Sequence, residues 1–117
     1  MKAQQGELDA ARLYQNLAAL TRDVQMKASF ASIATDEGRH AAVLKRYAGT
    51  KLKPGNQKAV IVGLIYRLMG PRFTLNMLAK AEFKAAVRYA PWVDRFPELA
   101  QVRAEEIEHG NKMRSML

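Results

Sequence analysis

The sequence of 117 residues contains two histidines, and each follows a glutamate by three positions. The pairs are Glu37 with His40 and Glu106 with His109. Residues three apart on an α-helix share one face, so each pair presents a carboxylate oxygen and an imidazole nitrogen side by side. One metal ion can be bound by such a pair, while the glutamate bridges to a second ion.

Both pairs interrupt apolar residues that repeat at helical spacing and therefore predict an inward face. An isolated inward histidine is usually a hydrogen-bonded core residue, but the repetition of the Glu-His pair favours a ligand role. The two stripes are Phe30, Ile33, Glu37, His40, Leu44 and Tyr47, and Leu99, Val102, Glu106, His109, Met113 and Met116.

A further glutamate precedes each pair on an earlier helix. Glu7 and Glu82 are each followed, seven residues later, by a tyrosine, Tyr14 or Tyr89. The chain therefore repeats one pattern, Glu-x6-Tyr and then Glu-x2-His. If the first two helices turn near Arg22, Glu7 and Glu37 both lie fifteen residues from the turn. Glu82 and Glu106 likewise both lie twelve residues from a turn near Asp94, so each pair of glutamates is level.

Helix-forming residues dominate and strong strand signals are absent, which predicts an all-α protein. The 24 residues 48–71 are long enough for a crossover that contains an extra helix. We therefore expect a four-helix bundle with a long crossover, in a single domain over residues 1–117. The predicted helices span residues 4–20, 22–47, 57–69, 72–90 and 97–116.

Four inward glutamates at one level repel one another and lose hydration, so apolar packing does not explain them. Two divalent cations would balance their four negative charges. The chain has no cysteine, which leaves oxygen and nitrogen as metal ligands and excludes an iron–sulfur or rubredoxin centre within these residues.

The two Glu plus Glu-x2-His hairpins, Glu7 with DEGRH and Glu82 with EEIEH, resemble the ferritin-like di-iron carboxylate proteins, especially rubrerythrins and bacterioferritins. The resemblance covers nearly the whole chain and implies a ferritin-like bundle with two iron ions. It also implies a role for each ligand: Glu37 and Glu106 bridge the ions, Glu7 and Glu82 are terminal ligands, and His40 and His109 bind one ion each.

Two positions depart from these families. Ala85 stands where rubrerythrins carry another glutamate, and Gly38 stands where bacterioferritins carry a haem-ligating methionine. We therefore expect no haem. Iron suits the oxygen-rich ligand set, manganese is possible, and zinc would be adventitious.

The resemblance implies a redox enzyme that reduces peroxide or oxygen with electrons from an external donor protein. A ferroxidase that stores or detoxifies iron is the alternative. Tyr14 and Tyr89 are candidates to hydrogen-bond the carboxylates. Asp36 and Glu105 are candidates to accept the second ring proton of the histidine on the other hairpin, His109 and His40 respectively.

A net charge of +8 would suit an anionic partner, but the lysines and arginines are spread along the chain, as on a solvated basic surface. A metal-free helical module that binds nucleic acid or an acidic protein is a further alternative. It leaves the inward glutamates unexplained, so nucleic acid is disfavoured as a partner.

The apolar run over residues 59–69 falls short of the roughly 20 residues that cross a bilayer, so no membrane span is predicted. The first ten residues, MKAQQGELDA, lack the apolar stretch of a secretory signal, and we expect a cytoplasmic protein. In the helix over residues 57–69, apolar side chains occupy more of the helix circumference than one packed face can bury. We therefore expect a homodimer or higher oligomer through this helix.

Overall fold

The structure is a computed structural model that describes residues 2–49 and 51–117. It contains helices and no strand over these residues, as predicted, and the chain divides into two compact units, Met1–Leu68 and Met69–Leu117. The first unit holds helices α1 (Lys2–Leu20), α2 (Val24–Ala48) and α3 (Gln57–Met69, whose last residue falls in the second unit). The second holds α4 (Pro71–Tyr89), the short 3-10 helix η1 (Ala90–Trp92) and α5 (Glu98–Ser115).

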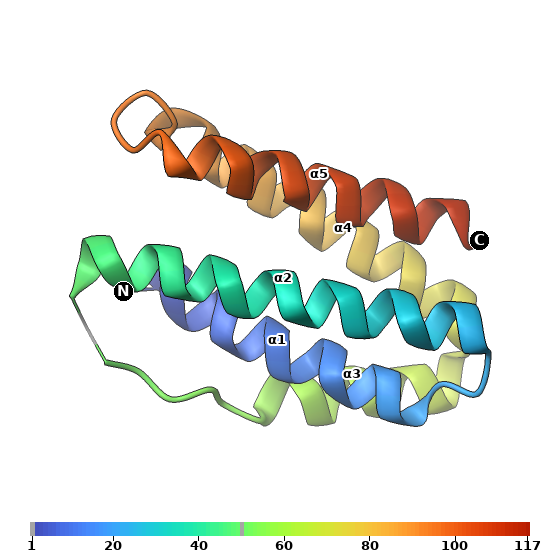
Figure 1. Cartoon of the computed structure of the whole chain (residues 1–117). Coiled ribbons are helices and arrows are strands. Elements are labelled where there is room, and N and C mark those ends of the chain that lie inside the picture. The colour runs from blue at the N-terminus through green and yellow to red at the C-terminus, as the bar shows by residue number, and fades with distance from the viewer. Residues whose placement is uncertain (1, 50) are drawn as a thin grey trace. The chain divides into compact units, whose positions relative to one another are not determined.

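In the first unit, α1 and α2 form an antiparallel hairpin with a very short turn (Figure 1). The Asp23 carboxylate accepts a 2.8 Å hydrogen bond from the Met26 amide, and this bond caps the N-terminus of α2. Helix α2 therefore begins two residues later than predicted. It ends at Ala48, and the capping residue Gly49 has a φ of 68°, in the left-handed region that glycine adopts without strain.

Helix α3 packs along α1 with its small residues. The buried residues of α3 are Ala59, Val62 and Gly63. A Cβ at Gly63 would lie only 2.8 Å from Nδ2 of Asn16, so a larger residue here would have to displace the Asn16 side chain. Nδ2 of Asn16 also donates a hydrogen bond to the Ala59 carbonyl oxygen, which ties α3 to α1.

In the second unit, α4 and α5 form the other hairpin, joined by η1 and a turn (Figure 1). Pro71 occupies the first turn of α4, where its missing amide costs no hydrogen bond. Gly70 precedes it at a φ of 86°, again a glycine conformation.

The predicted inward stripes are buried along most of their length, but the last residue of each is not: Met116, which follows the end of α5, is half-buried. Tyr47 is 40% exposed, because it lies in the last turn of α2, beyond Leu44, the last fully buried residue of the stripe. No helix in the described residues is both long and apolar enough to cross a membrane.

Candidate metal centre

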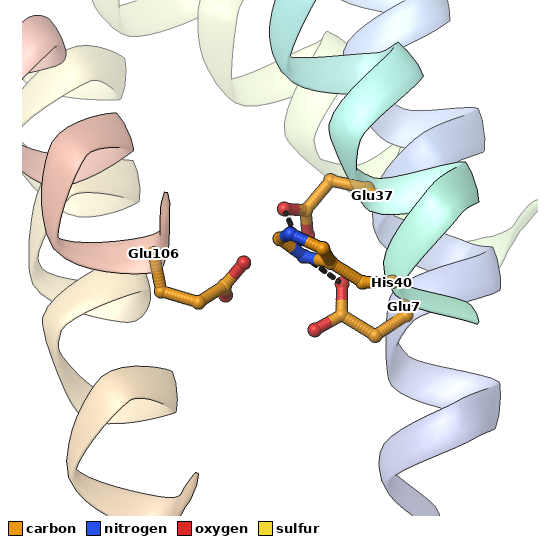
Figure 2. A group of neighbouring side chains, drawn as sticks. All are labelled: Glu7, Glu37, His40 and Glu106. Atoms are coloured by element: carbon orange, nitrogen blue, oxygen red, sulfur yellow. Dashed lines mark ion pairs between the residues drawn. The ribbon is translucent and has the colours of Figure 1, made fainter. Parts of the chain in front are cut away.

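The first unit brings together Glu7 from α1 with Glu37 and His40 from α2, and we call this trio the first half-site. Figure 2 shows both carboxylates turned toward the imidazole ring. Nδ1 of His40 lies 3.6 Å from Oε2 of Glu7 and 3.5 Å from Oε1 of Glu37. All three residues are buried. The predicted level register of the glutamates is therefore realised within this hairpin.

The second unit contains a matching trio, the second half-site, formed by Glu82 from α4 with Glu106 and His109 from α5. Nδ1 of His109 lies 3.7 Å from Oε1 of Glu82 and 3.8 Å from Oε1 of Glu106. These residues are also buried. In both hairpins the same ring nitrogen faces one carboxylate on each helix, so the sequence repeat is also a repeat in geometry.

The negative charge of the first half-site is costly without a cation. Burial raises the pKa of Glu7 from 4.5 to about 8. The contact with His40 opposes this rise, while the neighbouring charge of Glu37 adds to it. A buried carboxyl with such a pKa gains from any bound cation that stabilises its ionised form.

The spacing of the facing atoms suits a metal ion. Separations of 3.5–3.8 Å between nitrogen and oxygen are too long for a good hydrogen bond. Two ligands that bind one ion at about 2.1 Å lie about 3.0–3.4 Å apart, so side-chain movements of a few tenths of an ångström would bring these atoms to such a separation. In each half-site, the three residues offer ligand atoms within 4.8 Å of one another. The donor set and its spacing therefore fit one divalent cation in each half-site.

The four residues predicted to surround the ligands have different settings. Tyr14 and Tyr89 are buried on the helices that carry Glu7 and Glu82, and the Tyr14 ring packs against Phe30 with centroids 6.1 Å apart. Asp36 is half-buried on α2 and forms a 2.9 Å ion pair with Arg39. Glu105 is half-buried on α5. For Asp36 and Glu105, hydrogen bonding to the histidine of the other unit stays a prediction.

A buried polar residue near the start of the first hairpin, Gln4, was not predicted from the sequence. Gln4 lies three residues before Glu7 on α1 and is only 2% exposed. Its spacing extends the stripe of Glu7 by one helical turn, which is the signal that would have identified it. The residue in the same place before Glu82 is the buried Ala79, so this amide has no counterpart in the second hairpin.

A protein-family model described as Rubrerythrin matches residues 1–108. No curated protein and no solved structure matches the chain significantly. The family match confirms the predicted fold class, an all-α ferritin-like bundle, and confirms the resemblance drawn from the two Glu plus Glu-x2-His hairpins.

Proposed function

We propose, since the chain belongs to the rubrerythrin family of ferritin-like proteins, that its two half-sites together hold a pair of iron ions in one redox centre. One observation carries this proposal: the same buried trio of two glutamates and one histidine occurs on both hairpins. The two carboxylates and one imidazole of each trio would provide three ligands to one ion. The ligands are Glu7, Glu37, His40, Glu82, Glu106 and His109.

The charge of the ligands supports two divalent ions. Each unit buries two glutamates, so four negative charges are buried when all of them are ionised, and two divalent cations would balance these charges. Glu37 and Glu106 are proposed to bridge the ions, with Glu7 and Glu82 as terminal ligands. Carboxylate-rich sites with imidazole suit iron, and manganese is the second candidate.

The proposed reaction is the reduction of peroxide to water. The bound iron ions would supply one electron each, which together with two protons converts one hydrogen peroxide into two waters. Residues of the chain have supporting roles: the buried stripes exclude water around the ligands, and Tyr14 and Tyr89 are proposed to orient the carboxylates on their own helices. Oxygen is the alternative oxidant.

Electrons are proposed to arrive from a separate donor protein, because these residues contain no cysteine for a rubredoxin centre. The net charge of +8 would favour an acidic donor. The single domain over residues 1–117 and the cytoplasmic location stay predictions.

Metal analysis tests the proposed centre. Purified protein loaded anaerobically with ferrous iron should hold two ions per chain after gel filtration. Glu37→Ala and Glu106→Ala should each reduce this content, whereas Glu108→Ala, which removes an exposed glutamate from α5, should not. Equal iron content in all three variants would refute the ligand assignment.

Stopped-flow oxidation then separates the candidate activities. The ferrous protein should react faster with hydrogen peroxide than with oxygen if it is a peroxidase. Continued oxidation of added ferrous iron by oxygen, without an electron donor, would instead identify a ferroxidase. If the protein binds no iron but binds nucleic acid with an affinity that falls steeply with salt, the metal-free module is correct.

A further inference from the structure

Helix α3 exposes several of its larger apolar side chains. Four of them are between 50% and 74% exposed: Val60, Ile61, Leu64 and Leu68. Their spacing places them on one side of the helix, and we call them the outer stripe. The opposite side, with Ala59, Val62 and Gly63, is the one buried in the first unit. A helix of a water-exposed protein normally does the reverse, burying its larger apolar residues.

The rotation of α3 about its axis is held by specific contacts, so the outer stripe is not free to turn inward. Gly63 lies so close to Asn16 that any side chain at position 63 would have to displace the Asn16 amide. The hydrogen bond from Asn16 to the Ala59 carbonyl oxygen fixes the same face against α1. The loop before α3 is also tied to α1, by a hydrogen bond from the Gly55 amide to the Asp9 carboxylate and another from Gln5 to the Lys53 carbonyl oxygen.

The outer stripe lies in a part of the chain that has no negative charge. No aspartate or glutamate occurs between Glu37 and Glu82, whereas nine lysines and arginines do. On α3 itself, Lys58 and Arg67 are exposed and border the outer stripe on opposite sides. The exposed Lys51 and Lys53 precede the helix. Every charged residue on α3 and in the loop before it is therefore positive.

From this surface we propose that α3 docks on an anionic phospholipid membrane and lies in the plane of its headgroups. An apolar stripe bordered by lysine and arginine is the pattern of helices that bind in this way, with the apolar side chains inserted and the cations at the phosphates. A second copy of the chain, which the sequence predicts as the partner of this helix, suits the surface less well, because pairing two outer stripes brings like charges together. The inference is independent of the chemistry proposed for the metal centre.

Vesicle flotation of the full chain tests the inference. The protein should float with vesicles of phosphatidylcholine containing a quarter phosphatidylglycerol, and should float far less with phosphatidylcholine alone. Ile61→Ser combined with Leu64→Ser should weaken the binding more than about tenfold, because the inserted apolar area is lost. Val87→Ser, an exposed apolar residue of α4, is the control and should bind as the unchanged protein does.

A second pair of variants separates local charge from net charge. Lys58→Gln with Arg67→Gln should weaken binding to the anionic vesicles by about fivefold per charge. Lys27→Gln with Arg103→Gln removes the same charge from exposed positions on α2 and α5 and should have a smaller effect. Circular dichroism and iron content should stay unchanged in every variant, because all the substituted residues are exposed.

Three results would overturn the inference: no flotation with anionic vesicles, equal flotation of the Ile61→Ser and Leu64→Ser variant, or equal loss in the two charge variants. Light scattering over a dilution series decides the alternative. The outer stripe would be the interface with a second copy of the chain if two results were found together. The unchanged protein would form a dimer and not float, and the dimer would dissociate in the variant with Ile61→Ser and Leu64→Ser.

Discussion

The two hairpins place the same three ligands in the same way but surround them differently. Each hairpin sets a histidine Nδ1 at 3.5–3.8 Å from one carboxylate on either helix. The residue after the histidine is Ala41 in the first hairpin and Gly110 in the second, and both are buried. Gln4 lies three residues before Glu7, whereas Ala79 lies three residues before Glu82. The comparison teaches that helical register alone brings the ligands together, while the neighbouring packing can differ between the two repeats.

The equivalence of the half-sites predicts the largest effect. His40→Ala and His109→Ala should each lower the affinity of one half-site for metal by more than about 100-fold, since even residues that only support a ligand contribute 10–100-fold. Each variant should therefore retain about one iron ion per chain, measured by elemental analysis after gel filtration. If one of the two variants keeps its full metal content, the half-sites are not equivalent and only one histidine is a ligand.

A pH effect on the metal-free protein is expected from Glu7. Its pKa is about 8 in the folded state and 4.5 is the ordinary value, so the folded state holds the proton more tightly than the unfolded state. The resulting stabilisation is complete below about pH 4.5, declines as the pH rises, and is lost once the pH has passed about 8. It should amount to a few kcal/mol, on the order of one per pKa unit.

Urea unfolding at several pH values checks this effect. Glu7→Gln cannot ionise, so its free energy of unfolding should fall less steeply between about pH 5 and about pH 8 than that of the unchanged protein. Parallel pH profiles for the two proteins would contradict the raised pKa. Bound metal should also flatten the profile, because it stabilises the ionised carboxylate.

Two helical glycines, Gly110 in the second hairpin and Gly38 in the first, predict smaller effects on stability that are opposite in sign. A Cβ at Gly110 would lie 2.7 Å from the Phe83 ring, which also packs against the guanidinium of Arg114 at 4.7 Å. Gly110→Ala should therefore destabilise the protein by about 1–2 kcal/mol, after allowing for the better helix propensity of alanine. On α2, a Cβ at the exposed Gly38 meets nothing within 4 Å, so Gly38→Ala should stabilise by about 0.5–1 kcal/mol. Thermal unfolding of the two variants measures both, and shifts of the same sign would show that Phe83 moves aside without cost.

Much of the fold and the candidate site follows from periodicity in the sequence. The helix over residues 57–69 was predicted with its observed bounds, because Pro54 and Gly55 precede it and Gly70 and Pro71 follow it. The ligand trios follow from residues three apart on one face and from equal distances to a turn. These are local or arithmetic properties of a helical hairpin, so they need no knowledge of side-chain packing.

Features set by packing were not predictable in the same way. Hydrophobicity alone would bury Leu64 and Leu68, yet the structure buries Ala59 and Gly63, whose small size lets α3 lie close to Asn16 of α1. The contact between Phe83 and Gly110 likewise depends on how α4 and α5 pack. The outward position of Tyr47 reflects the end of the buried stripe, which the spacing of residues does not mark.

The smallest effect concerns how the two hairpins begin their second helix. Asp23 caps α2 with its side chain, whereas α5 begins after Pro97 with no side-chain cap. Asp23→Ala should lower the free energy of unfolding by about 1 kcal/mol, and Asp23→Asn should restore most of it, because the asparagine oxygen accepts the same hydrogen bond. Iron content should stay at the level of the unchanged protein in both variants, since the register of Glu37 and His40 against α1 depends on the buried stripe, which starts at Phe30, beyond the capped turn. A loss of iron in Asp23→Ala that Asp23→Asn restores would mean instead that the cap sets the ligand register, and that the first hairpin, unlike the second, positions its half-site from the turn.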